Sequence, residues 1–275
     1  SYDIKVVKTH MEWWTPASWE FGEKHYYRFL SSLNERVNRL ADIIGENEIN
    51  VVHSSTLTVL DGAIAAMVTG RPHIWDIRGH FEGNDGSSFG IYLPIQTIYN
   101  IADSLSTRFV AVSHSVKRFL LRYLPGDKID VIHDCVDLEL FEDNSKKGAH
   151  LDEDFPGLEG KFKVALVGRI SPVKGVEDFV EAAALVAQKR GDAGFVIVGP
   201  VEDEALFEKV KTAIKRRALS DRIVFTGRRK DVPALMQEID LLVCSSLSEG
   251  LPNSCLEAMA ASKAVVATRC GGAEE

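Results

Sequence analysis

Short apolar runs alternate with longer amphipathic stretches along the chain. The apolar runs are rich in Val, Ile and Phe and are bounded by polar or glycine-containing segments, as is typical of buried strands. Strands that alternate with helices form right-handed crossover units, so the pattern predicts an α/β fold built on parallel sheets. The predicted strands are Ile4–Val7, Ile49–His53, His73–Ile77, Phe109–Val112, Ile129–Ile132, Phe162–Val167, Phe195–Val198, Ile223–Thr226, Leu241–Cys244 and Ala264–Ala267.

The longest amphipathic stretch lies between the first two predicted strands. Apolar residues recur there at intervals of three and four, which places them on one face of a helix. They are Tyr26, Phe29, Leu30, Leu33, Val37, Leu40 and Ile44.

One polar segment interrupts this rhythm. The stretch "LELFEDNSKKGAHLDEDFPGLEGK" is charged and contains Gly and Pro, which is typical of a connection between domains. The chain is therefore predicted to form an N-terminal Rossmann-like domain (1–140), a linker (141–160) and a C-terminal domain (161–275). Ligands of doubly wound parallel sheets bind at the carboxyl ends of strands, and we expect two such sheets to face each other across a cleft.

Composition narrows the functional classes. With 275 residues, 45% hydrophobic and 26% charged, the chain is typical of a soluble globular protein, and it has no apolar run of about 18 residues that would predict a membrane span. The net charge of −8 argues against a nucleic-acid partner, which requires a basic face. The cysteines lack CxxC spacing, so we expect reduced thiols of a cytoplasmic protein, with no zinc site and no disulfide. They are Cys135, Cys244, Cys255 and Cys270.

The segment "VGRISPVKG" brings two cations to the end of a predicted strand. Gly168 ends the strand, Arg169 follows it, and Lys174 precedes a helix that is predicted to begin near Val176. Two cations beside the free N–H groups of a helix start suit a diphosphate. An ordinary strand-to-helix loop with surface charges is the alternative.

A second segment, "SSLSEGLPNSCLEAMA", carries two carboxylates that could face the same cleft. Glu249 lies in a loop, and Glu257 lies about one turn into a helix that is predicted to start near Pro252–Ser254. Carboxylates in these places suit sugar hydroxyls, although for Glu257 a stabilising charge near a helix start is an alternative.

Together these segments resemble the second domain of the family 4 (group 1) glycosyltransferases, retaining nucleotide-sugar enzymes of the GT-B fold. The resemblance extends over Phe162–Glu275, where the family's motifs occur in order: the Arg169 and Lys174 loop, "FVIVGP", "RIVFTG", "IDLLVCSS", Glu249-Gly250-x6-Glu257 and "VVATRCGGAEE". It implies that Arg169 and Lys174 hold the donor diphosphate, and that Glu249 and the backbone after it hold the sugar. It also implies that Glu257 holds the ribose. The remaining donor-binding candidates are Gly168, Gly227, Arg228, Gly250, Leu251, Asn253 and Ser254.

The first half resembles the acceptor domain of the same family more loosely. "FVAVSHSVKRFL" and "IDVIHDCVD" match its segments before the domain crossover, with Cys135 where a glycine is usual. The acceptor-side candidates are Arg78, which stands where many members have a histidine, and His80. The family's glycine-rich first loop and its final strand and helix are absent, so we expect the chain to be an incomplete copy of a longer enzyme.

The resemblance implies transfer of a sugar from a nucleoside-diphosphate sugar to an acceptor hydroxyl by a front-face route with retention. Arg169, Lys174, Glu249 and the helix start near Ser254 form the expected catalytic set. The nucleotide sugar is then a substrate, and no cofactor is expected. A nucleotide-sugar epimerase, a phosphorylase of similar fold, or a catalytically silent nucleotide-sugar-binding subunit are the alternatives.

The acceptor side is less defined. A carbohydrate, a lipid-linked molecule or a small molecule would all fit, and peripheral contact with the inner face of a membrane is left open. Trp13, Trp14 and Trp19 could serve as an acceptor platform, as a membrane-facing patch or as core packing. No metal is expected, because the only Asp-x-Asp sequence, Asp152-Glu153-Asp154, lies in the acidic linker and is expected to be solvated.

Overall fold

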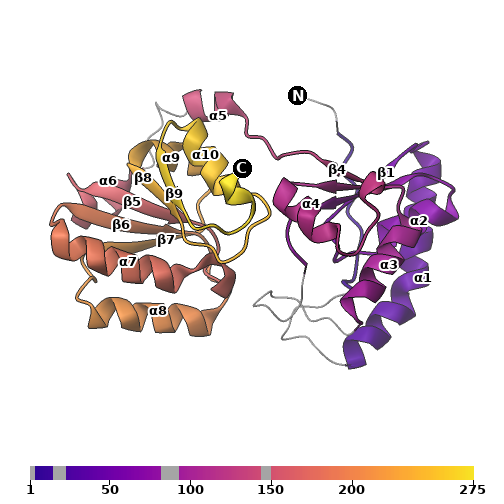
Figure 1. Ribbon diagram of the computed structural model, residues 1–275, viewed down its shortest axis with the longest axis horizontal. Coiled ribbons are helices and arrows are strands. Elements are labelled where there is room, and N and C mark those ends of the chain that lie inside the picture. Colours follow the sequence, from indigo (N-terminus) through magenta and orange to yellow (C-terminus); the bar gives the residue numbers. More distant parts are fainter. Residues whose placement is uncertain (1–3, 15–22, 82–92, 144–149) are drawn as a thin grey trace. The chain divides into compact units, whose positions relative to one another are not determined.

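The computed structural model describes residues 4–14, 23–81, 93–143 and 150–275. The chain divides into two compact units, Ser1–Ile132 and His133–Glu275, each built on its own parallel sheet (Figure 1).

The first unit contains a four-stranded parallel sheet in the order β1-β2-β3-β4. Trp75 of β2 is fully buried, and its indole N–H donates to the carbonyl oxygen of Thr56 at 2.6 Å. The elements are α1 (Glu23–Glu46), β1 (Val52–Ser55), α2 (Asp61–Val68), β2 (His73–Ile77), α3 (Ile95–Leu105), β3 (Arg108–Ala111), α4 (His114–Leu120), η2 (Gly126–Lys128) and β4 (Ile129–Val131).

The second unit contains a five-stranded parallel sheet in the order β7-β6-β5-β8-β9. The strand order reverses between β5 and β8, and in such sheets ligands bind at the carboxyl ends of the strands beside that reversal. The elements are α5 (Leu138–Asp143), α6 (Leu151–Asp154), η4 (Pro156–Leu158), β5 (Phe162–Val167), η5 (Pro172–Lys174), α7 (Val176–Lys189), β6 (Ala193–Val198), α8 (Glu204–Arg216), β7 (Ile223–Gly227), α9 (Val232–Glu238), β8 (Leu241–Cys244), α10 (Asn253–Ala260), β9 (Ala264–Ala267) and η6 (Gly272–Glu274).

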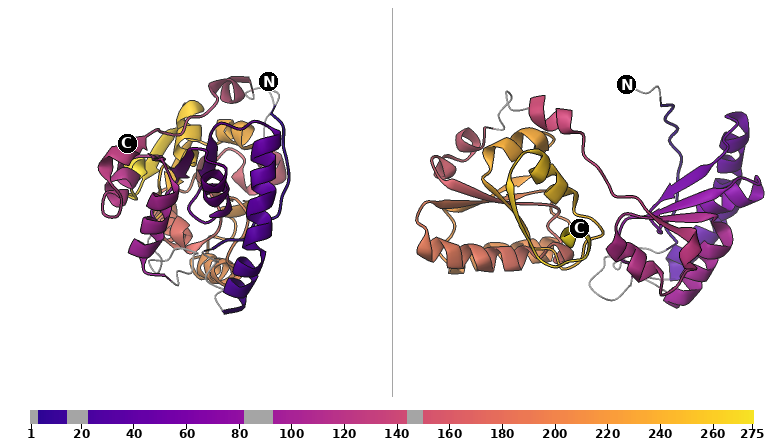
Figure 2. Two further views of the ribbon diagram at one scale, coloured as in Figure 1. Left: turned by 90° about the vertical axis from the view of Figure 1, so that its right-hand side faces the viewer. Right: turned by 45° about the horizontal axis from the view of Figure 1, so that its top comes forward.

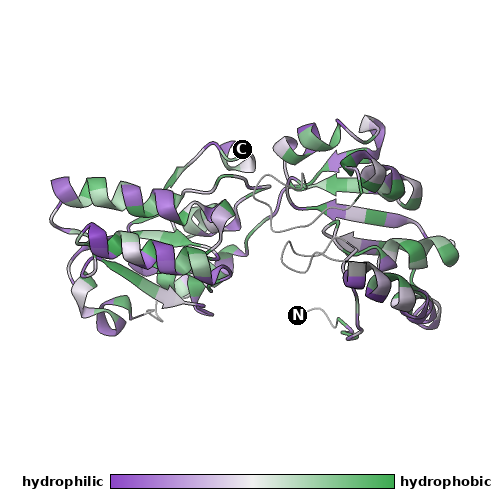
Figure 3. Cartoon of the chain, turned by 90° about the horizontal axis from the view of Figure 1, so that it is seen from below, coloured by the Kyte–Doolittle hydropathy of each residue, from purple (hydrophilic) through white to green (hydrophobic). Residues whose placement is uncertain are grey.

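Helices cover both faces of the second sheet. Successive residues of β6 alternate between two cores: Phe195 and Ile197 pack with α7 and α8, whereas Val196 and Val198 pack with α9 and α10. Figures 1 and 2 show α7 and α8 along one face and α9 and α10 along the other. Because both faces are buried, the central strands are almost wholly hydrophobic, while the helices carry both kinds of residue (Figure 3).

Nine of the ten predicted strands are present, and four have the predicted bounds. The prediction of a strand at Ile4–Val7 is wrong: the segment has no strand structure, and Ile4 and Val6 are 74% and 78% exposed. A short apolar run is stable as a strand only where a neighbour pairs with it and buries one face. The predicted long helix is α1, in which Phe29, Val37 and Ile44 are buried, but Leu30 points to solvent.

The junction between the units differs from the sequence pattern. The chain divides after Ile132, before the predicted boundary at 140, and Val136 packs against the core of the second unit, to which Phe141 of α5 also belongs. The predicted linker, 141–160, supplies Leu151 and Leu158 to that same core, and both are fully buried. Asp152, Glu153 and Asp154 lie on the short helix α6, whose first residue, Leu151, is buried in this core.

Candidate active site

β5 and β8 are neighbours in the sheet, and the loops that follow them carry most of the candidate donor residues. The loop after β5 runs from Gly168 to Gly175, and the loop after β8 begins at Ser245. The backbone N–H of Leu247 donates to the carbonyl oxygen of Val173 at 2.8 Å, and the Ser245 hydroxyl donates to the carbonyl oxygen of Lys174 at 3.0 Å. Segments more than 70 residues apart in sequence are thereby fixed side by side.

Gly175 allows this close approach. Its backbone is left-handed, with φ of 58°, and a Cβ atom at this position would lie 2.1 Å from the carbonyl oxygen of Ser245. Contacts of that length do not occur, so any side chain would push the two loops apart.

Lys174 and Glu249 form an ion pair between the two loops. The Lys174 ammonium Nζ donates to Glu249 Oε1 at 2.5 Å, and the hydroxyl of Ser246 donates to the same oxygen at 2.7 Å. The side chains are only 21% and 14% exposed, so the pair is largely shielded from solvent. A shielded cation held between loops at the carboxyl edge of the sheet is a suitable partner for an anionic ligand.

The loop after β9 fixes Glu249 from the other side. Its backbone N–H donates to the carbonyl oxygen of Cys270 at 2.6 Å, and its carbonyl oxygen accepts from Gly272 at 3.2 Å. The final segment of the chain, "TRCGGAEE", is thus part of the site's framework.

Arg169 lies in the same loop as Lys174 but is more accessible. Its side chain is 56% exposed and donates to Glu202, which follows β6. Gly227 and Arg228 lie at the end of β7, two strands away from β5, and both are exposed. The described residues show no contact between these two positions and the Lys174–Glu249 pair.

Glu257 lies on α10 and is half-buried. Burial raises the pKa of its carboxyl group, and the described residues provide it with no hydrogen bond or ion pair. The other candidates around the start of α10 differ in exposure: Gly250 is buried, Leu251 and Ser254 are partly buried, and Asn253, the first residue of the helix, is exposed.

The acceptor-side candidates belong to the first unit. Arg78 donates to Asp76 of β2 at 3.2 Å. His80 instead lines a cavity with Arg118, Phe119 and Arg122. Sequence reasoning missed both arginines, although Arg118 lies in the quoted segment "FVAVSHSVKRFL".

Other predicted features have plainer outcomes. Cys244, Cys255 and Cys270 are buried thiols, whereas Cys135 is exposed. Trp14 packs into the core, and its indole N–H donates to the carbonyl oxygen of Leu57 at 2.6 Å. Trp19 lies outside the described residues. No helix among the described residues is both long and apolar enough to cross a membrane.

The Asp-x-Asp carboxylates form ion pairs. Asp152 pairs with Lys163 at 2.9 Å, and Asp154 pairs with Arg229 at 3.0 Å. Arg229 also binds Asp231, whose hydrogen bond raises the pKa of the guanidinium.

Two family models match successive parts of the chain. Residues 16–140 match "Glycosyltransferase Family 4", and residues 161–275 match "Glycosyl transferases group 1". The chain belongs to the group 1, family 4 glycosyltransferases. The predicted α/β fold, two Rossmann-like units of the GT-B class, is likewise confirmed by solved structures of this class.

Curated relatives of this chain differ in the substrates that their names state. It is 29% identical over 240 residues to the UDP-Gal:alpha-D-GlcNAc-diphosphoundecaprenol alpha-1,3-galactosyltransferase of Escherichia coli, covering 85% of this chain and 61% of the relative. It is 30% identical to the 2-deoxystreptamine glucosyltransferase of Streptomyces kanamyceticus, covering 78% and 57%. The chain therefore spans about three fifths of the length of these relatives.

Among solved structures, Anabaena HepE in complex with UDP-glucose superposes with a TM-score of 0.72. The two are 25% identical, with 86% of this chain and 64% of HepE covered.

Proposed function

We propose that the full-length protein transfers a sugar from a UDP-sugar to a hydroxyl group of an acceptor, with retention at the anomeric carbon. The observation that carries this proposal is the Lys174–Glu249 pair, held at the reversal of the second sheet by loops that follow β5 and β8. The names of the Escherichia coli relative and of the HepE complex support UDP as the carrier.

Lys174 and Arg169 would stabilise the leaving diphosphate. An ammonium group has three N–H donors, so Lys174 can keep its bond to Glu249 while it donates to phosphate oxygens. Arg169, exposed and paired with Glu202, can turn to the same anion at low cost. Preorganised cations of this kind act where negative charge develops in the transition state.

In the front-face reaction, the bond between the anomeric carbon and the diphosphate oxygen breaks. The acceptor oxygen bonds to that carbon on the same face, and its proton passes to the departing diphosphate. Glu249 would orient the sugar through its hydroxyl groups. Glu257 would accept hydrogen bonds from the ribose, which would compensate the partial desolvation of its carboxylate.

The names of the relatives indicate which chemical class of acceptor to expect. The names of the Escherichia coli and Campylobacter jejuni relatives include lipid-linked diphosphates, whereas that of the Streptomyces kanamyceticus relative includes 2-deoxystreptamine. These names support a carbohydrate-type hydroxyl as the acceptor. A lipid-linked acceptor would bring the enzyme to the inner face of a membrane.

Replacing Lys174 with alanine tests the proposal, with Lys189→Ala as control because Lys189 is an exposed lysine at the end of α7. Loss of a charge-assisted contact costs about 1.5–3 kcal/mol, so Lys174→Ala should lower transfer efficiency by about tenfold to a hundredfold. Wild-type donor turnover by Lys174→Ala would refute the assignment. If the unaltered protein binds UDP but transfers sugar to no acceptor, it is a silent subunit. If it converts the donor in the absence of an acceptor, it is an epimerase.

A further inference from the structure

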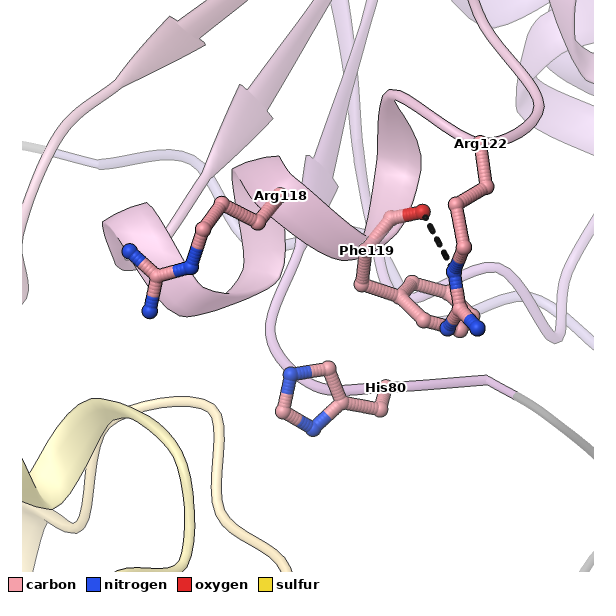
Figure 4. Close-up of a pocket in the computed structure, with 4 residues that line it drawn as sticks. All are labelled: His80, Arg118, Phe119 and Arg122. Carbon is pink, nitrogen blue, oxygen red and sulfur yellow. Dashed lines mark hydrogen bonds between the residues drawn. The ribbon is translucent and has the colours of Figure 1, made fainter.

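A basic cavity lies in the first unit, whereas the donor candidates belong to the second. The cavity has a volume of about 350 Å³ and is lined by His80, Arg118, Phe119 and Arg122. Arg118 is on α4 and Arg122 is four residues further on, in the turn that follows the helix. In Figure 4, the imidazole of His80 lies between the two guanidinium groups.

The charge of this segment contrasts with that of the whole protein. Residues 104–126 contain no Asp or Glu but four Lys and Arg, in a chain whose net charge is −8. Two of the four lie outside the cavity and bind backbone carbonyl oxygens, Arg108 that of Asp127 at 2.6 Å and Lys117 that of Ile129 at 2.8 Å. The other two, Arg118 and Arg122, line the cavity and give its wall a positive charge.

Aromatic packing fixes the position of Arg122. Its guanidinium lies 4.3 Å from the ring centroid of Phe119 and 5.5 Å from that of Tyr123, and its Nε donates to the carbonyl oxygen of Phe119 at 3.3 Å. Tyr123 in turn stacks on the buried Tyr99 with ring centroids 4.8 Å apart. A guanidinium held in this way loses little conformational entropy when it binds an anion.

His80 is held against the same helix. Its Nε2 shares a hydrogen bond of 3.2 Å with the Ser115 hydroxyl, and its ring meets that of Phe119 edge-on at 5.4 Å. The cavity thus combines two guanidinium groups with an imidazole, all anchored on α4 and its following turn.

We propose that this cavity binds a phosphoryl group carried by the acceptor. The inference rests on the proposed transferase function and specifies the chemical class of its acceptor as a glycosyl phosphate or diphosphate. Two planar guanidinium groups can each form paired hydrogen bonds to phosphate oxygens, and their combined charge matches a dianion better than a single carboxylate. The volume lies within the range of small-molecule sites, about 300–1,000 Å³, and is large enough for a phosphate or diphosphate group.

Inorganic pyrophosphate, titrated by calorimetry into the full-length protein saturated with UDP, tests this site, because UDP occupies the donor site. The wild-type protein should bind pyrophosphate, whereas Arg118→Gln and Arg122→Gln should each weaken binding by tenfold or more. Arg39→Gln is the matched control: Arg39 is an exposed arginine on α1, and its replacement changes the net charge equally. Arg122→Lys keeps the charge but not the planar fork, and should give intermediate affinity.

Pyrophosphate binding that is absent from the wild type, or equal in Arg118→Gln and Arg39→Gln, would overturn the proposal. Replacement of Arg118 should leave the fold intact, because its side chain lines a cavity and not the core, and unchanged melting temperatures would verify this. UDP binding is measured separately. If UDP binds and pyrophosphate does not, the transferase proposal stands and this one falls. If the protein binds pyrophosphate in a manner that depends on Arg118 but does not bind UDP, the anion site stands and the transferase proposal falls.

Two further arms distinguish the sources of the phosphoryl group. Sedimentation with phosphatidylcholine vesicles that contain a polyprenyl diphosphate, but not with vesicles that lack it, would assign a lipid-linked acceptor if it depends on Arg118. Binding of glucose 1-phosphate that depends on Arg118, without vesicle sedimentation, would assign a soluble acceptor. Dependence on Arg118 in neither arm would contradict the proposed acceptor class.

Discussion

Replacing Gly175 with alanine should separate the two loops that hold the candidate donor site. The added Cβ atom would lie 2.1 Å from the carbonyl oxygen of Ser245. Ser245 precedes Ser246, which binds Glu249, and its own hydroxyl binds the backbone of Lys174. Movement of Ser245 would therefore misplace both members of the ion pair.

The size of the effect follows from the geometry. The carbonyl oxygen must retreat by about 1 Å before the contact reaches 3.0 Å, and a misplacement of about 1 Å can cost about a hundredfold in rate. A side chain in the left-handed region adds about 1–2 kcal/mol of backbone strain, which lowers stability. Gly175→Ala should thus be modestly less stable and about a hundredfold less active.

Gly160→Ala separates strain from collision. Gly160 lies in the same unit with φ of 66°, and a Cβ atom added there would have no neighbour within 4 Å. Thermal melts and steady-state transfer from a UDP-sugar should be measured for both variants of the full-length protein. We expect similar losses of stability from backbone strain, but a loss of transfer efficiency only for Gly175→Ala.

Unchanged transfer efficiency in Gly175→Ala would refute this reasoning, because it would mean that the spacing of the loops does not control the site. A loss in Gly160→Ala as large as that in Gly175→Ala would likewise show that backbone strain alone accounts for the effect.

Three other predictions test the site and the core. Glu257→Gln should weaken UDP binding about tenfold to a hundredfold, whereas Glu249→Gln should spare UDP binding and reduce transfer; calorimetry with UDP alone would contradict this division if the losses were equal. Transfer should persist in excess EDTA, because Lys174 and Arg169 supply the charge and the Asp-x-Asp carboxylates are engaged in ion pairs; activity that is lost and then restored by magnesium or manganese would contradict this. Desolvation lowers the pKa of buried His73 to about 4, against about 6.5 when unfolded, so the free energy of unfolding should be fully retained above pH 6.5 and fall by up to about 3 kcal/mol as the pH drops to 4. Urea unfolding at several pH values should show that the fall in the free energy of unfolding between pH 6.5 and 4 is smaller in His73→Gln by this amount.

The linear pattern of residues was enough to locate most elements and the loops that carry the donor chemistry. The alternation of apolar runs with amphipathic stretches located nine strands, because a strand buried on both faces must be continuously hydrophobic. The same pattern placed Arg169 and Lys174 in the loop after β5, and Glu249 in the loop after β8. The run at Ile4–Val7 misled this reasoning, since local hydrophobicity does not reveal whether a partner strand is available.

Which of these loops meet depends on the tertiary structure. Periodicity reports which face of an element is buried, but not which strand lies beside it. The order β7-β6-β5-β8-β9 makes β5 and β8 neighbours, and this brings Lys174 against Glu249, 75 residues later in the chain. In the same way, packing of α4 beside the segment after β2 brought Arg118 and Arg122 to His80, a cluster that no local pattern contains. Such contacts depend on how helices pack against sheets, which is a property of the whole unit and not of any short segment.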